Sequence, residues 1–128
     1  MEKFNFGKWF LIYIQSGFYV AAGLNHFINP EFYLPLIPNW VPLPEFTHLG
    51  FGVFEILFGL GLLISSQRKY AGLAIIVMLI LLIPSHVFFL LKESCTESLC
   101  VPEWIGWVRL IIVHPFLMLW ALKAKDIT

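Results

Sequence analysis

The sequence predicts an all-α integral membrane protein, a four-helix bundle that forms a single domain over residues 1–128. The chain is 59% hydrophobic and only 12% charged, with a mean hydropathy of +0.84, far from the balance of a soluble domain. It also holds four apolar windows, each close to the roughly 20 helical residues that cross a bilayer core. No stretch alternates apolar and polar residues as a barrel strand does.

The predicted spans cover residues 7–27, 46–64, 70–91 and 104–122. The first is too long for the apolar region of a signal peptide, so we expect it to stay in the protein as a helix. The third and fourth contain Pro84 and Pro115, and each proline leaves the carbonyl four residues earlier without its helical donor. We therefore expect kinks in the third and fourth helices.

The connection between the first two spans is rich in proline and aromatic residues. Within NPEFYLPLIPNWVPLPEF, five prolines accompany Phe32, Tyr33, Trp40 and Phe46. Proline interrupts helices, and aromatic rings favour the membrane interface. We expect this outer loop to lie in the interface as a cap over the bundle, with a plain interfacial anchor as the alternative.

The basic residues predict the orientation, because lysine and arginine accumulate in short cytoplasmic loops. One side of the predicted bundle carries Lys3, Lys8, Arg68, Lys69, Lys123 and Lys125, whereas the loops on the other side carry only Lys92. Both termini should therefore be cytoplasmic in a multi-pass protein of the bacterial inner membrane. The eight basic and eight acidic residues balance, which gives no indication of nucleic-acid binding.

The only two cysteines, Cys95 and Cys100, fall on the predicted outer side. Disulfides persist in that oxidising environment, so we expect a disulfide that tightens the turn between the third and fourth helices. A redox-active dithiol is the alternative, although its spacing differs from the C-x-x-C of oxidoreductases.

Ionisable side chains within the spans are few, and each costs at least about 2.5 kcal/mol on insertion scales. They are His26, His48, Glu55, His86, Arg109 and His114. All four histidines fall between the outer rim and the midplane, so a cavity among them should open outward. On the second helix, His48, Gly52, Glu55 and Gly59 form one stripe, and the glycines allow a neighbouring helix to approach closely.

Glu55 and Arg109 are the only acid and the only arginine well inside the spans. A guanidinium would keep the carboxylate ionised and offer two parallel hydrogen bonds. We expect the two side chains to lie within hydrogen-bonding reach or to be bridged by water or a ligand. A salt bridge that only fixes helix packing is the alternative.

The four histidines, His26, His48, His86 and His114, lie on four different helices and could converge on a metal or haem. Motifs such as H-E-x-x-H are absent, and single histidines that bond loop carbonyls offer a simpler account.

The order of motifs resembles the DoxX-like membrane proteins, from about Gly23 to Ala121. The motifs are GLNHFINPEFY, the proline-rich LPLIPNWVP, GVFEILFGLGLLI, and WVRL near the start of the fourth helix. The matching positions are His26, Phe27, Pro30, Phe32, Tyr33, Pro38, Gly52, Glu55, Gly59, Pro84 and Arg109. The fourth helix departs from the expected R-L-P-L-Q, because it reads RLIIVHP. Relatives in that family are linked to membrane oxidoreductase complexes, one a subunit of a thiosulfate:quinone oxidoreductase.

These observations predict an outward-facing pocket that binds a quinone or another small lipophilic molecule. Its walls would comprise His26, His48, Glu55, His86 and Arg109, with Tyr33 and Trp40 from the loop. Glu55 and a histidine would exchange protons with a quinone while Arg109 holds the carboxylate ionised. The chain would be at most a subunit of a quinone-linked oxidoreductase, because no flavin, haem-attachment or iron–sulfur motif is present and a redox partner must supply electrons.

Two other functions stay open from the sequence. One is a non-catalytic bundle that assists assembly of a larger complex or transports a small solute. The other is a metal-binding or haem-binding bundle that uses the histidines. The sequence leaves open whether the chain forms a homo-oligomer in the bilayer.

Overall fold

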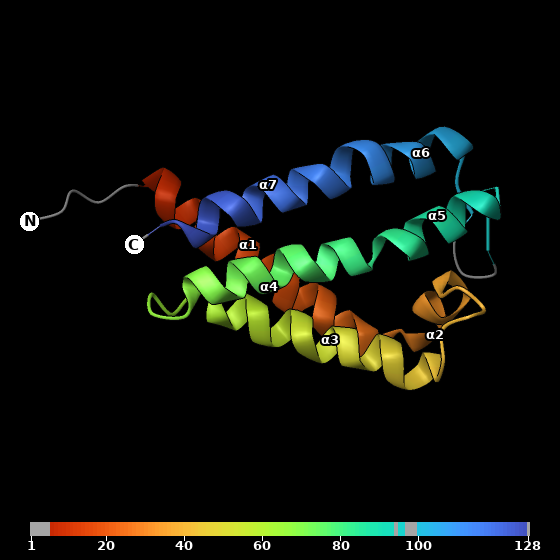
Figure 1. Cartoon of the computed structure of the whole chain (residues 1–128), viewed down its shortest axis with the longest axis horizontal. Coiled ribbons are helices and arrows are strands. Elements are labelled where there is room, and N and C mark those ends of the chain that lie inside the picture. The colour runs from red at the N-terminus through yellow and green to blue at the C-terminus, as the bar shows by residue number, and fades with distance from the viewer. Residues whose placement is uncertain (1–5, 94, 97–99, 128) are drawn as a thin grey trace, which may run out of the picture.

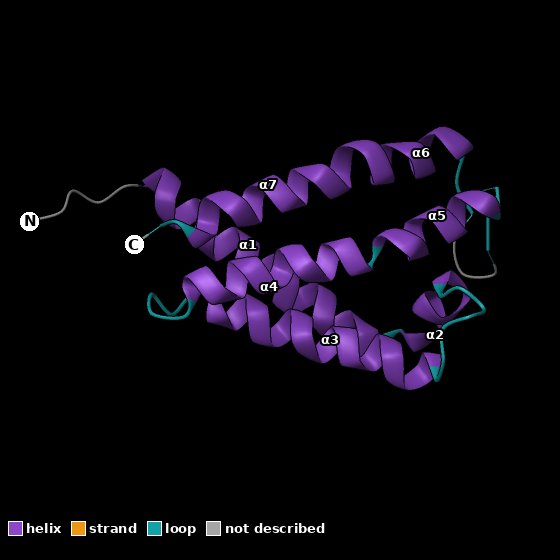
Figure 2. Cartoon of the chain, viewed as in Figure 1, coloured by secondary structure: helices purple, strands orange, loops and turns teal. Residues whose placement is uncertain are grey.

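The computed structural model describes residues 6–93, 95–96 and 100–127. Apart from an isolated bridge between Cys95 and Cys100, the regular structure of these residues is helical, which confirms the predicted all-α class (Figures 1 and 2). The elements are α1 (Phe6–Ile28), α2 (Pro30–Tyr33), η1 (Leu34–Leu36), α3 (Pro44–Gly61), α4 (Arg68–Leu81), α5 (Ile83–Leu91), α6 (Glu103–Val108), η2 (Arg109–Val113) and α7 (His114–Lys125). Lys3 and Glu97 lie outside the described residues.

The long helices run along one common axis. Figure 1 shows the start of α1, the end of α7 and the turn between α3 and α4 at one end, and α2 with the α5 to α6 connection at the other. The stretches Arg68–Leu91 and Glu103–Lys125 are each long and apolar enough to cross a membrane. The four predicted windows correspond to α1, α3, α4 with α5, and α6 with η2 and α7.

Both predicted interruptions occur, each next to its proline. Leu82 is a turn residue between α4 and α5, so Pro84 falls in the first turn of a new helix, where no N–H is needed. Ahead of Pro115 the chain forms the π-helical η2, and the His114 N–H bonds the Arg109 carbonyl five residues back. A π-bulge of this kind accommodates the missing donor without ending the helix.

Small residues allow α1 and α3 to pack closely. A Cβ built on Gly52 would lie 2.8 Å from the His26 Cβ and 2.9 Å from the Gly23 carbonyl oxygen. Farther from the outer loop, the Ser16 hydroxyl of α1 donates to the Gly59 carbonyl of α3 at 2.7 Å. Backbones approach this closely only where side chains are absent or small. The Gly52 and Glu55 stripe therefore faces α1.

The bundle has an apolar core around Leu62, Ile75 and Leu79, but it also buries polar groups and exposes large apolar side chains. Buried polar or charged residues include Gln15, Ser16, His26, His48, Glu55, Arg68 and His114. Large apolar side chains are instead exposed along every long helix, for example Ile14, Leu57, Leu60, Ile80, Ile111, Ile112 and Leu119. Soluble proteins rarely expose apolar surface on this scale.

Arg68 has a role that the sequence reading did not anticipate. The sequence places Arg68 among the basic residues between the second and third predicted helices, and in the structure it is only 3% exposed. Its Nε donates to the Leu62 carbonyl at 2.7 Å and its Nη1 to the Ile127 carbonyl at 3.0 Å. The guanidinium thus joins the C-terminal ends of α3 and α7, where the helix dipoles favour a cation.

Candidate functional site: a polar cavity beneath the proline-rich loop

A cavity of about 210 Å³ lies among α1, α3, α5, the outer loop and the end of α6. Its lining includes all seven residues that the sequence suggested for a ligand pocket, namely His26, Tyr33, Trp40, His48, Glu55, His86 and Arg109. The structure therefore brings together side chains from five segments: α1, the outer loop, α3, α5 and the start of η2. Whether they bind a ligand stays a prediction.

The expected direct pair between Glu55 and Arg109 is absent. Glu55 is 7% exposed, and its Oε2 lies 3.5 Å from the His26 Nε2 instead. The reason is the close packing at Gly52, which brings α1 and its histidine against the carboxylate. In the described part of the chain, α3 has no close backbone contact with η2, so Arg109 approaches the cavity from another wall.

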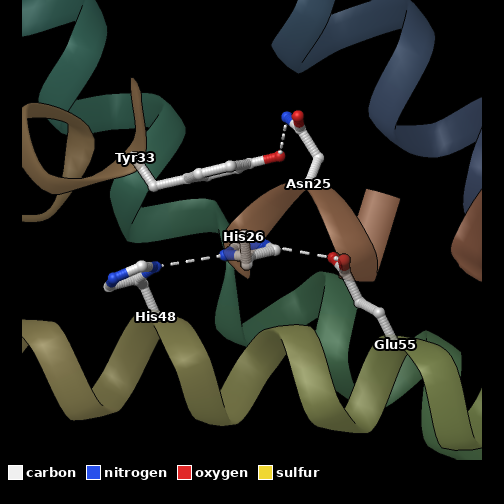
Figure 3. A network of polar contacts seen from close by, with 5 residues as sticks. All are labelled: Asn25, His26, Tyr33, His48 and Glu55. Atoms are coloured by element: carbon white, nitrogen blue, oxygen red, sulfur yellow. Dashed lines mark hydrogen bonds and ion pairs between the residues drawn. The ribbon is translucent and has the colours of Figure 1, made fainter. Parts of the chain in front are cut away.

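His26 lies between two other ionisable side chains (Figure 3). Its Nδ1 is 3.5 Å from the Nδ1 of His48, and its Nε2 faces Glu55. A carboxylate can only accept, so the His26 nitrogen that faces it should carry the proton. In the tautomer with its proton on Nε2, His26 can accept at Nδ1 from an Nδ1–H of His48. The three groups form an aligned path from His48 to Glu55, with contacts at the long limit of hydrogen bonding.

Tyr33 covers His26 from the loop side. The two rings are stacked with centroids 3.8 Å apart, and the Tyr33 hydroxyl accepts a 2.7 Å hydrogen bond from the Asn25 amide (Figure 3). Burial raises the pKa of Tyr33 above its ordinary value; donation from Asn25 opposes this shift and the Glu55 charge adds to it. Tyr33 is thus a neutral phenol that fixes the orientation of the His26 ring.

Arg109 has unused hydrogen-bonding capacity at the cavity. Its guanidinium carbon is 5.0 Å from the centre of the Phe89 ring, a cation–π contact. Its buried Nη1 has no hydrogen-bond partner among the described residues, and the same is true of Glu55 Oε2. Buried polar atoms are rarely left unsatisfied in proteins. Glu55 and Arg109 thus both line the cavity, and each keeps a buried polar atom without a hydrogen bond, although Glu55 Oε2 is also in ion-pair contact with His26.

The four histidines do not converge. His26 pairs with His48, whereas the rings of His86 and His114 meet edge to face with centroids 4.8 Å apart. His114 bonds the Leu79 carbonyl through Nε2, close to the break at Leu82. Among the described residues, no three His, Cys, Asp or Glu side chains are grouped as metal ligands. The four-histidine metal site suggested as an alternative is thus not formed.

Cys95 and Cys100 form the expected disulfide, with their sulfur atoms 2.14 Å apart. Neither cysteine lines the cavity, so the bond is separate from the polar site. The redox alternative for this pair stays a prediction.

Several contributors lie outside the set of site residues predicted from the sequence. Asn25 orients Tyr33, and Ser85 donates to the Leu36 carbonyl at 2.8 Å, which attaches α5 to the loop. Gln15 and Tyr19 are buried, and their side-chain polar atoms have no hydrogen-bond partner among the described residues. The sequence places Gln15, Tyr19, Ala22 and His26 on one face of α1 by their helical spacing, which is the signal that links Gln15 and Tyr19 to the site.

The fold and the site define the class of protein. It is an all-helical chain with an apolar exterior and a polar cavity near one end. The chain belongs to the family described as Domain of unknown function (DUF8561), whose model matches residues 15–125. No curated protein and no solved structure matches it. The matched residues include every residue that lines the cavity, and the description of the family assigns no function.

Proposed function

We propose that the protein is a four-helix bundle of the bacterial inner membrane whose outward-facing cavity binds a quinone or similar lipophilic molecule by its polar head. The membrane assignment is supported by the apolar exterior and by the two stretches able to cross a bilayer. Polar groups at membrane depth usually face the bundle interior and mark functional sites. The cavity fits that pattern, because its ionisable groups all face inward.

The observation that carries the ligand proposal is the pair of unsatisfied buried atoms, Arg109 Nη1 and Glu55 Oε2, at walls of one cavity. A carbonyl oxygen of the ligand would accept from Arg109, and a hydroxyl would donate to Glu55. A quinone offers the first group and its quinol the second. The ligand would thereby provide the bridge that the direct Glu55 to Arg109 pair does not.

The aligned His48, His26 and Glu55 groups support proton exchange with such a ligand. A proton that enters at His48 would pass to His26 while His26 releases its Nε2 proton toward Glu55 and the ligand. Contacts of 3.5 Å commonly shorten when a ligand binds. A quinone reduced in this cavity would take protons along this path and electrons from a partner oxidoreductase.

The resemblance to DoxX-like proteins supports the same role, that of an accessory subunit for a membrane oxidoreductase. Among the residues that carry the resemblance, His26, Tyr33, Glu55 and Arg109 line the cavity.

The test begins with gentle purification and mass spectrometry of the bound molecules, for which we expect a quinone or a related lipophilic compound. Equilibrium binding of decyl-substituted benzoquinone is then compared between the wild type, Glu55→Gln and Arg109→Met. Loss of a hydrogen bond to a charged group should weaken binding by about tenfold or more in both variants.

Glu103→Gln is the matched control, because Glu103 is an exposed acid at the start of α6 that does not line the cavity. Its affinity should equal that of the wild type. If Glu55→Gln and Arg109→Met bind the probe as the wild type does, the proposed function is wrong. Retention of a stoichiometric metal ion in place of an organic molecule would also count against it.

A further inference from the structure

An apolar groove of about 530 Å³ lies beside the polar cavity, on the outer surface between α3 and α4. Along α3 it is lined by Phe46, Thr47, Gly50, Phe51, Phe54 and Phe58, which follow helical spacing on one face. Along α4 it is lined by Ala74, Val77, Met78 and Leu81, again on one face. From Phe46 to Phe58 the groove extends roughly 18 Å at the rise of an α-helix.

The groove and the cavity share part of their walls. Thr47, Phe51 and Leu81 line both. The shared residues lie at the N-terminal part of α3 and the C-terminal end of α4, which is the end of the bundle that holds the cavity. From there the groove continues toward Phe58 and Ala74, farther from the outer loop. The two spaces are thus neighbours, and Thr47, Phe51 and Leu81 mark the junction between them.

The two spaces differ in chemistry. The cavity carries histidines, a carboxylate and a guanidinium, whereas the groove offers hydrocarbon and aromatic surface, including the stacked rings of Phe54 and Phe58. The hydroxyl proton of Thr47 is already donated to the Pro42 carbonyl at 2.9 Å. The junction therefore suits a hydrocarbon chain that is attached to a polar head group in the cavity and extends from it into the groove.

The size of the cavity also indicates that it holds only part of a larger ligand. Pockets that enclose a whole drug-sized ligand measure roughly 300–1,000 Å³, and this cavity is smaller. It has room for a polar head group, so the rest of a larger ligand must lie elsewhere. The adjoining groove has the necessary volume and opens to the exterior, since Phe54 and Val77 are each about half exposed.

We infer that the groove holds the hydrocarbon tail of the molecule whose polar head occupies the cavity, and that this molecule enters sideways from the bilayer between α3 and α4. The inference rests on the proposed function and adds the ligand's shape: a compact hydrogen-bonding head on a single long apolar tail. The tail would run from Phe51 toward Phe58, which directs it to the middle of the membrane.

Gly50 offers a clean obstruction test, because it lines the groove and a Cβ built there meets no atom within 4 Å. Gly50→Phe should fill the groove without disturbing the fold. Gly17→Phe is the matched control, since Gly17 on α1 is equally free of neighbours and lies outside the groove. Thermal unfolding in detergent should be alike for both variants and the wild type.

Dissociation constants are measured for methyl-substituted and decyl-substituted benzoquinone, which share a head and differ in the tail. We expect Gly50→Phe to raise the dissociation constant of the decyl probe by about tenfold or more and to leave that of the methyl probe unchanged. Gly17→Phe should change neither. A decyl probe with a photoreactive diazirine at the tail end should label peptides from 44–61 and 68–81.

Other results separate the two proposals. If both probes bind and Gly50→Phe affects neither, the tail assignment is wrong and the proposed function stands. If neither probe binds the wild type, both are wrong. Labelling of α1 or α7 by the diazirine would overturn the tail assignment. A third result would also overturn the tail assignment. If the wild type is a dimer, Gly50→Phe is a monomer, and the two proteins bind each probe with equal affinity, the groove is a contact between copies of the chain.

Discussion

At the scale of single residues, the geometry of the site depends on which residue lies next to each buried charged group. Glu55 was expected to meet Arg109, and it meets His26 because Gly52 lets α1 approach α3. Arg109 instead lies over Phe89. Both groups retain an unsatisfied atom, and both residues line the cavity.

Gly52 should tolerate no side chain. In Gly52→Ala the new methyl group would lie 2.8 Å from the His26 Cβ, which requires α1 to shift away. We expect a loss of about 1–3 kcal/mol in the free energy of unfolding. Unfolding in detergent, followed by circular dichroism, measures it.

Gly50→Ala is the control for this substitution, because its methyl group meets open space on the same helix. Its stability should be unchanged or higher by up to about 1 kcal/mol, since alanine favours the helix. Equal stability of Gly52→Ala and Gly50→Ala would show that the close contact with His26 is not required.

At the scale of the elements, proline and arginine decide how helices end and join. Pro84 divides one apolar window into α4 and α5, and Pro115 follows the π-helical η2. These irregular segments border the cavity: Leu82, Pro84 and Arg109 all line it. The sequence located both interruptions. It could not indicate that Arg109 lies within η2, because a π-bulge depends on how neighbouring helices accept the displaced backbone.

Arg68 should be essential for the end of the bundle opposite the cavity. Arg68→Met removes the donor to the carbonyls of Leu62 and Ile127 and leaves them without this partner. We expect a loss of roughly 1.5–3 kcal/mol in the free energy of unfolding, as for hydrogen bonds to a charged group. Thermal or urea unfolding in detergent provides the measurement.

The adjacent exposed residue supplies the comparison. Lys69→Met removes the same formal charge from the same turn and should leave stability nearly unchanged. If the two variants unfold alike, the bonds of Arg68 to the helix ends contribute nothing. Ligand binding should be unaffected by either change, since neither residue lines the cavity.

At the scale of the whole molecule, large apolar side chains cover the exterior while several polar groups are buried beside the apolar core, an arrangement favoured when lipid is the solvent. The end of α7 and the α3 to α4 turn occupy the end opposite the outer loop (Figure 1). The basic residues Arg68, Lys69, Lys123 and Lys125 fall at that end, so the proposed orientation places it on the cytoplasmic side.

Single-cysteine labelling tests this orientation. In a Cys95→Ser and Cys100→Ser background, Asn39→Cys in the outer loop should react with a membrane-impermeant maleimide in intact cells. Ser66→Cys, in the α3 to α4 turn, should react only after permeabilisation; both positions are exposed. The reverse pattern would contradict the proposed orientation, and reaction at both positions in intact cells would contradict a spanning bundle.

The sequence by itself determined the all-helical class, the four apolar windows, the proline interruptions and the disulfide, because hydrophobic run length, proline geometry and cysteine spacing act locally. It also indicated which side chains would line a cavity, since ionisable groups amid apolar residues have to face inward. Only the tertiary structure decided the partners: His26 for Glu55, Phe89 for Arg109, helix ends for Arg68, and two histidine pairs. Those outcomes depend on how closely α1 and α3 approach and on where α3 and η2 stay apart, and such distances arise from packing between segments far apart in the chain.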